Sequence, residues 1–276
     1  MPERRLGRAG AGFGLAIVVL LGAALVLPFV YMVTTSLMDE FQVLRPPLAI
    51  FPTHPLFGNY PEALAALPFW RFFVNSTLVS VAVAAAQVFT SATAAFAFAR
   101  LRFPGRDRIF LVFLSTLTIP AIVLLIPRFL IVNALGWVDA YAGLIATELV
   151  TVWGIFLLRQ FFQLIPRELE DAARLEGAGE WQVFRRVVLP LSRPALATVA
   201  LLGFVGQWTN FLWPLVVTRS VRMQVVEVGL ASFHGMYAAN WPYQMAAAVT
   251  TLVPLVVLWF VAHRYFVRGI QLTGVS

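Results

Sequence analysis

The sequence predicts an all-α integral membrane protein with six transmembrane helices. Hydrophobic residues make up 60% of the 276 residues and charged residues 12%, with a mean hydropathy of +0.83, far from the globular average. Six runs almost free of charge each approach the roughly 20 residues that a helix needs to cross a ~30 Å hydrocarbon layer. The arginines gather in alternate connections between these runs. The expected spans are 11–33, 72–99, 109–127, 140–158, 194–218 and about 243–262.

The first span is expected to remain in the protein rather than to be cleaved. Its 23 apolar residues exceed the roughly 7–15 of a signal-peptide core, and no small-residue cleavage site follows. Residues 34–71 then form an external connection that is too rich in proline for a long helix.

The second and third spans carry distinct packing signals. Small residues such as Ser80, Ala84 and Ser91 recur through the second span, and such residues let transmembrane helices approach closely. We therefore expect this span at the centre of the bundle. Pro120 lies inside the third span and is expected to kink it.

The fourth and fifth spans contain most of the polar groups at membrane depth. Glu148 is the one acid well inside a predicted span, about seven residues from Tyr141. An ionised side chain at mid-helix costs on the order of 2.5–3.5 kcal/mol on insertion scales. Glu148 should therefore face water or a partner. Gln207 and Asn210 lie in the fifth span.

Between these spans, residues 166–194 form a long charged segment that must lie in water beside the membrane. Leu169, Ala172 and Leu175 have roughly helical spacing, Gly177 and Gly179 interrupt the pattern, and a second short amphipathic run follows. The pattern predicts a helix, a glycine turn and a helix. Pro194 suits the first turn of the next span.

The arginine distribution predicts the orientation. With a cytoplasmic N-terminus, fifteen of the twenty arginines lie inside, and both termini and the segment 159–193 are cytoplasmic. Five arginines then lie outside: Arg45, Arg71, Arg128, Arg219 and Arg222.

Composition excludes several classes of chemistry. The chain contains no lysine, so it has neither a Walker A phosphate loop nor a Schiff-base lysine, and it contains no cysteine for disulfides or thiolate metal sites. His54, His234 and His263 are too scattered to form a metal site. We expect no cofactor, metal or catalytic residues in this chain, and no nucleic-acid binding. Two classes of function are kept as alternatives to a transporter subunit: an intramembrane enzyme, and a channel or scaffold subunit without energy coupling.

The charged segment resembles the EAA loop of bacterial ABC-importer permeases. The motif appears as Asp171-Ala172-Ala173, then Gly177-Ala178, and then Val187, Leu189 and Pro190. The flanking residues are similar to the carbohydrate branch, of the MalG type. Two acids depart from the usual form: Asp171 replaces a glutamate and Glu176 an aspartate, which changes the reach of each side chain but keeps the charge.

The resemblance implies a type I importer permease fold over a single domain, 1–276, with a coupling loop at about 164–194. It also implies external loops at 34–71 and 219–242. Contacts with the ATPase subunit would come from Glu168, Asp171, Ala172, Gly177 and Ala178. Contacts with a solute-binding protein would come from Tyr237, Asn240 and Trp241, although an aromatic belt at the membrane interface would also explain the aromatic residues.

By the same resemblance, the chain would be a non-catalytic permease subunit in the bacterial cytoplasmic membrane that imports a sugar or sugar-like solute. Its partners would be a second, non-identical permease, two ATPase subunits that bind ATP and Mg²⁺, an external binding protein and membrane lipid. A permease for glycerol phosphate or a polyol is the alternative. Glu148, with Gln207 and Asn210, would either border the solute pathway or be paired structurally with a neighbouring helix or the partner permease.

Overall fold

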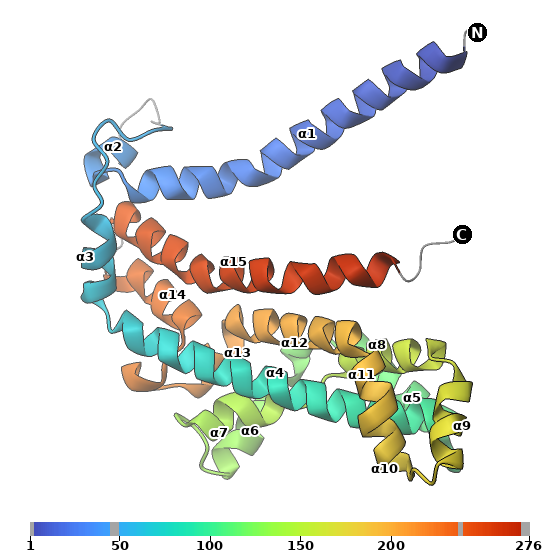
Figure 1. The fold of residues 1–276 in the computed structure, drawn as a ribbon. Coiled ribbons are helices and arrows are strands. Elements are labelled where there is room, and N and C mark those ends of the chain that lie inside the picture. Colours follow the sequence, from blue (N-terminus) through green and yellow to red (C-terminus); the bar gives the residue numbers. More distant parts are fainter. Residues whose placement is uncertain (1–2, 45–49, 237–239, 272–276) are drawn as a thin grey trace. The chain divides into compact units, whose positions relative to one another are not determined.

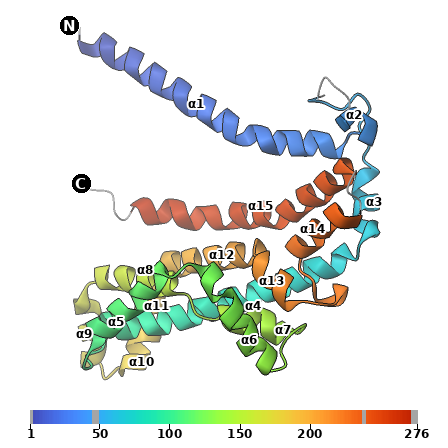
Figure 2. The same ribbon diagram turned by 180° about the vertical axis from the view of Figure 1, so that it is seen from behind.

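The computed structural model describes residues 3–44, 50–236 and 240–271, and the regular elements within these ranges are all helices (Figures 1 and 2), which confirms the all-α prediction. The α-helices are α1 (Glu3–Ser36), α2 (Glu40–Leu44), α3 (Asn59–Ala66), α4 (Phe69–Arg100), α5 (Arg106–Ser115), α6 (Leu125–Ala134), α7 (Tyr141–Ile145), α8 (Val152–Leu164), α9 (Arg167–Leu175), α10 (Glu180–Val183), α11 (Leu189–Leu191), α12 (Arg193–Trp208), α13 (Leu212–Val217), α14 (Val226–Met236) and α15 (Trp241–Gln271). The 3₁₀ segments are η1 (Thr116–Thr118), η2 (Ala121–Leu124), η3 (Ala146–Glu148) and η5 (Val221–Met223), and η4 (Phe184–Val188) is a π-helix.

Within the part of the chain that the structure describes, three helices are long and apolar enough to cross a membrane by themselves: Gly14–Ser36 of α1, all of α4, and Trp241–Ala262 of α15. Three further pairs of consecutive helices are each bent at a short break, and if each pair counts as one span the number of spans rises to six. The expected kink at Pro120 is a bend of 94° between Arg106–Thr118 and Ala121–Ala134. Proline has no N–H to continue the helical ladder, which explains a break at this point.

The bend before α12 separates a span from the charged loop. Glu180–Leu191 meets Arg193–Trp208 at 79°. Arg185 and Arg186 lie exposed in the first segment, so we assign that segment to the membrane surface rather than to the hydrocarbon layer. The expected fifth span, 194–218, comprises α12 and α13 and is interrupted at residues 209–211.

The chain divides into two compact units, which are described separately. The first comprises Met1–Pro68 and Leu230–Val253. Within it, the Asn59 amide donates hydrogen bonds to the carbonyls of Ser36 and Met38, both at 2.8 Å, and the Tyr60 hydroxyl lies 2.8 Å from Ser36 Oγ. These bonds fix the start of α3 to the end of α1.

The second unit, Phe69–Gly229 with Pro254–Ser276, is organised around α4. This 32-residue helix, about 48 Å long at 1.5 Å per residue, packs along α8 and α12 (Figure 1). Its buried face includes Ser80, Ala84 and Ser91. Small side chains let neighbouring helices approach closely, as at Gly154 of α8, where a Cβ atom would lie 2.7 Å from Ser91 Oγ.

Candidate functional site

Helix α9 presents an exposed face at one end of α4. Its first turn contains Glu168 and Glu170 and its last turn Arg174, a distribution that complements the helix dipole. Leu169 and Leu175 of α9 are 47% and 91% exposed, and Trp181 of α10 is 61% exposed. Apolar side chains left exposed on a charged loop indicate a contact surface for another protein.

A glycine turn joins α9 to α10. Gly177 has φ +89°, a backbone conformation that side-chain-bearing residues rarely adopt. Its N–H donates to the Arg174 carbonyl, and the Ala178 N–H donates to the Ala173 carbonyl, both at 3.0 Å. A Cβ atom at Gly177 would meet no atom of this chain within 4 Å. The requirement for glycine is therefore conformational within this chain.

Arg174 links the two helices across this turn. Its guanidinium donates to Asp171 and Glu180, each at 2.9 Å, and lies 3.4 Å from Glu170. The hydrogen bond with Glu180, supported by the one with Asp171, raises the pKa of Arg174 above its ordinary value. The turn is thus closed by ion pairs as well as by backbone bonds.

A buried ion pair attaches α9 to the end of α4. Arg100 Nε lies 2.5 Å from Glu170 Oε1, and the two side chains are only 4% and 1% exposed. Arg100 Nη2 also donates to the carbonyls of Phe162 and Ile165, at 2.5 and 2.8 Å. One arginine therefore joins the end of a transmembrane helix, the end of α8 and the charged loop.

A polar cavity of about 310 Å³ lies elsewhere in the same unit. Its lining includes Gln87 of α4, Glu148, Gln207 and Asn210. The chain is broken between the segment Tyr141–Glu148, formed by α7 and η3, and α8, and these two segments meet at 43°. The Gln87 amide donates to the Glu148 carbonyl at 2.8 Å, and the Thr90 hydroxyl donates to the Leu149 carbonyl at 2.9 Å. Side chains of α4 thus satisfy carbonyls that the break leaves without helical partners.

Arg128 of α6 neutralises the acid in this cavity. Its guanidinium forms an ion pair with the Glu148 carboxylate and donates to Thr147 Oγ1 at 2.7 Å. It also lies 4.3 Å from the centre of the Trp213 ring. The two charged side chains are 25% and 23% exposed; Glu148 lines the cavity, and Arg128 contacts Glu148 from outside the lining. The partner of Glu148 is therefore a neighbouring helix of the same chain.

Residues 87–272 match the protein family described as "Binding-protein-dependent transport system inner membrane component". The chain belongs to this family. It is therefore a non-catalytic, multi-pass permease subunit of an ABC importer.

Curated relatives of the permease carry different solutes. It is 33% identical over 264 residues to the sn-glycerol-3-phosphate permease protein UgpE of Brucella abortus, covering 92% of this chain and 94% of the relative. It is 36% identical over 208 residues to the arabinooligosaccharides permease protein AraQ of Halalkalibacterium halodurans, covering 75% of each chain.

Solved structures share the fold of the permease. A chain of a bacterial ABC transporter for the acidic polysaccharide alginate superposes with a TM-score of 0.81 at 25% identity, covering 94% of this chain and 98% of that one. An alginate transporter in complex with a periplasmic protein that holds an alginate pentasaccharide gives a TM-score of 0.70 at 14% identity, covering 94% of each chain.

The residues predicted for coupling lie together on α9 and its turn. Glu168, Asp171, Ala172 and Gly177 are exposed, whereas Ala178 packs against a buried cluster that includes Phe184. Their contact with an ATPase subunit stays a prediction. The sequence analysis did not single out Arg100 or Glu170. The one available signal was the position of Glu170, directly before the Asp171-Ala172-Ala173 motif.

The other predicted residues are divided between the two units. Glu148, Gln207 and Asn210 line one cavity in the second unit. In the first unit, Asn240 Oδ1 accepts the Tyr243 N–H at 3.1 Å, and Trp241 begins α15. Tyr237 lies outside the described residues. The sequence did not connect Arg128 with Glu148, because it assigned Arg128 to an external connection.

Asp139 joins two connections of the permease and is expected to make its stability depend on pH. Asp139 Oδ1 accepts the N–H groups of Arg219 and Ser220, both at 2.9 Å, and the Asp139 N–H donates to the Val217 carbonyl. Burial alone would raise the pKa of this carboxyl, but the hydrogen bonds from Ser220 and Arg219 outweigh it and lower the pKa below its ordinary value.

Because the pKa of the Asp139 carboxyl is lower in the folded protein than in the unfolded chain, its ionised form stabilises the fold. This stabilisation is fully present above the pKa in the unfolded chain, about 3.9, and is lost as the pH falls through the pKa in the folded protein. Asparagine also tolerates the φ of +61° at this position. We therefore expect Asp139→Asn to lower the thermal midpoint at pH 5–7 and the difference from wild type to shrink below about pH 4. A difference that stays constant from pH 7 to pH 3 would contradict this role.

Proposed function

We propose that the permease moves a sugar or sugar-like solute across the cytoplasmic membrane by alternating access, coupled to ATP hydrolysis in a separate subunit. The observation that carries the proposal is the exposed α9–α10 loop, held to α4 by the buried Arg100–Glu170 pair. A rigid link between a docking surface and a transmembrane helix can convert movement of a partner into movement of the spans.

The proposed contact with the ATPase subunit combines acids and apolar side chains. Glu168 and Asp171 are exposed and would meet basic groups of the partner. The exposed side chains of Leu169, Leu175 and Trp181 would pack against its surface. Ala172 and Gly177 would allow close approach, and Ala178 would support the turn from behind. ATP and Mg²⁺ would be held by two such partner subunits.

The second permease and the binding protein are inferred from the family, and the side of the membrane on which each partner binds is inferred from the distribution of arginines. A second, non-identical permease would complete the transmembrane pore. Fifteen of the twenty arginines support cytoplasmic termini and a cytoplasmic loop. On the external side, Asn240 and Trp241, with Tyr237, would meet a solute-binding protein, as the alginate transporter meets its periplasmic protein. A cap of α15 by Asn240 would hold Trp241 in a fixed position.

The polar cavity supports a solute rich in hydroxyl groups. Gln87, Gln207 and Asn210 offer amide donors and acceptors, and Glu148 offers a carboxylate whose charge is balanced by Arg128. A cavity with no net charge favours a neutral sugar over an anion. The alternative, a glycerol phosphate or polyol, is favoured by the similarity to UgpE and by Arg128, a cation paired with the cavity-lining Glu148.

Two opposite variants test this proposal. Glu148→Gln frees the charge of Arg128, and uptake is expected to shift towards an anionic solute by about tenfold, equivalent to about 1.4 kcal/mol. Arg128→Gln frees the charge of Glu148, and the preference is expected to move the opposite way. The measurement is competitive uptake of a labelled neutral oligosaccharide and labelled glycerol phosphate by the reconstituted importer.

Glu40→Gln provides the matched control, because Glu40 belongs to α2 and lies outside the cavity. It should leave the preference unchanged. If both cavity variants assemble normally and keep the wild-type preference, the cavity is not on the solute pathway. If both variants lower the yield of the complex without changing the solute preference, the Arg128–Glu148 ion pair only holds neighbouring helices together.

A further inference from the structure

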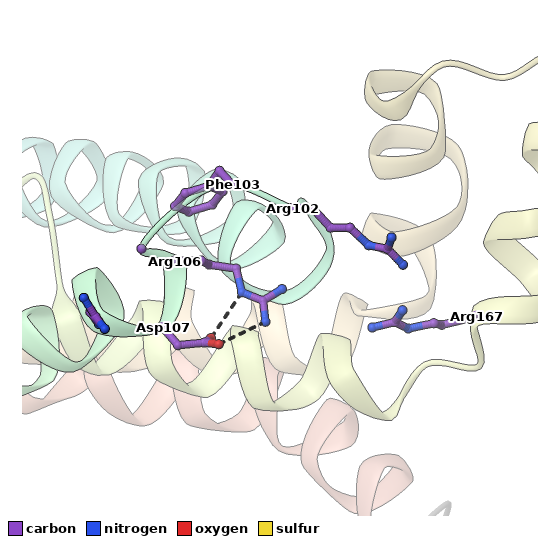
Figure 3. A pocket seen from close by; sticks show the side chains of 7 residues that line it. Arg102, Phe103, Arg106, Asp107 and Arg167 are labelled. Carbon is purple, nitrogen blue, oxygen red and sulfur yellow. Dashed lines mark hydrogen bonds and ion pairs between the residues drawn. The ribbon is translucent and has the colours of Figure 1, made fainter.

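A second hollow, named here the arginine pocket, lies at the connection between α4 and α5. Its volume is about 650 Å³. The charged and aromatic residues that line it are Arg102, Phe103, Arg106, Asp107, Arg108 and Arg167. Figure 3 shows the side chains of Arg102 and Arg167 entering the same region from the α4–α5 connection and from α9. Four arginines and one aspartate give the pocket a net charge of +3.

The single acid in the pocket is already shared. Arg106 contacts Asp107 at 3.1 Å (Figure 3), and Arg159 approaches the same carboxylate at 3.5 Å. Over residues 3–44, 50–236 and 240–271, no acidic side chain forms an ion pair with Arg102, Arg108 or Arg167. Arg102 and Arg167 also border a hollow that contains Glu170, Asp171 and Glu180, but these acids are paired with Arg100 and Arg174. Three neighbouring cations outside any ion pair form a ready site for an anion.

The position of the pocket indicates which anion. The transmembrane helix α4 ends at Arg100, and α5 begins at Arg106. Leu111 and Val112 of α5 are 64% and 65% exposed, and such an apolar surface is suited to contact with lipid. At a rise of 1.5 Å per residue, Arg108 lies only about 5 Å along the helix from Leu111. The arginines therefore lie at the depth of lipid headgroups rather than far out in water.

Phe103 adds a second indication of lipid. It lines the pocket and is 36% exposed, so an apolar ring stands beside the cations. A phospholipid presents both features together, with a phosphate on its headgroup and apolar carbon directly below. A soluble polyanion presents only the charge. Basic pockets beside transmembrane helices on the cytoplasmic side are suited to anionic headgroups.

We propose that the arginine pocket binds the phosphate of an anionic phospholipid, such as phosphatidylglycerol, in the cytoplasmic leaflet. The choice of leaflet rests on the proposed orientation of the permease. Arg102 and Arg167 would hold the phosphate from opposite elements, and Arg108 would contribute from α5. Because Arg167 is the first residue of α9, the bound lipid would also hold the start of the coupling helix near the membrane.

The test measures lipid binding to the purified, full-length importer complex by native mass spectrometry. Phosphatidylglycerol and phosphatidylcholine are titrated separately. The double variant Arg102→Gln/Arg167→Gln is expected to weaken phosphatidylglycerol binding by at least about tenfold, with little effect on phosphatidylcholine. The lysine pair Arg102→Lys/Arg167→Lys keeps the charges and should retain most of the binding.

Arg219→Gln/Arg222→Gln is the matched control, since it removes the same charge from the other predicted face and should leave phosphatidylglycerol binding unchanged. Equal binding by wild type and the pocket variant would overturn the proposal. Competition by millimolar inorganic phosphate, with equal retention of both lipids, would reassign the site to free phosphate. Because no solute is present, a negative result here says nothing against sugar transport, and a failed uptake assay says nothing against this site.

Discussion

Replacing Gly177 with leucine is expected to reduce solute uptake by at least about tenfold. The φ of +89° costs a residue with a Cβ on the order of 1–2 kcal/mol, and relief of that strain would change the angle between α9 and α10. The leucine side chain would also project outward, since no atom of this chain lies within 4 Å of its Cβ position. It would therefore enter the proposed contact with the ATPase subunit.

A series at the same position separates these two effects. Asparagine tolerates a positive φ, alanine adds strain without bulk, and leucine adds both. Uptake and ATPase copurification should decline in the order glycine, asparagine, alanine, leucine. If Gly177→Leu assembles and transports like wild type, α9 and its turn are not the coupling element. If alanine is as damaging as leucine, backbone strain rather than contact explains the loss.

Removing Arg100 is expected to have the second large effect. Arg100→Met removes the nearer partner of the Glu170 carboxylate, which is only 1% exposed and keeps only the longer contact with Arg174 at 3.4 Å; breaking a buried pair in this way costs about 3–5 kcal/mol. The variant should lower the thermal midpoint of the complex and abolish uptake. Arg106→Met removes an arginine from an exposed pair instead and should cost at most about 1 kcal/mol.

The double variant Arg100→Met/Glu170→Met distinguishes stability from transmission. Replacing both members of a buried pair by apolar side chains is often neutral, so the thermal midpoint should recover substantially. Uptake should remain low, because the polar link between α4 and α9 is gone. Recovery of uptake together with stability would mean that the pair only stabilises the fold and does not transmit movement.

Much of the fold could be predicted because the bilayer imposes a length on each apolar run. The extent of α4, the break at Pro120 and the glycine turn at Gly177 are local properties, written in neighbouring residues. The interruptions at residues 149–151 and 209–211 were not predicted. No proline marks the first of them, the charge of Glu148 beside it does not by itself predict a break, and the carbonyls of Glu148 and Leu149 are satisfied by Gln87 and Thr90, some sixty positions away.

The ion pairs show the same limit more clearly. Arg100 was counted as a cytoplasmic charge and Arg128 as an external one, because a positive-inside count treats each arginine without a partner. Their acids, Glu170 and Glu148, are 70 and 20 residues along the chain. The requirement of Glu148 for a partner followed from the cost of burying charge, but the identity of that partner depended on how the helices pack.

The exposed apolar side chains of α9 and α10 affect how the subunit is handled in the cell before the complex assembles. In the proposed assembly, a newly made copy would display Leu169, Leu175 and Trp181 to the cytoplasm until the ATPase subunit covered them. Such a surface is what chaperones and membrane proteases recognise on incomplete complexes. Copies produced in excess of the ATPase would be degraded, so the cellular amount of permease would follow that of its partner.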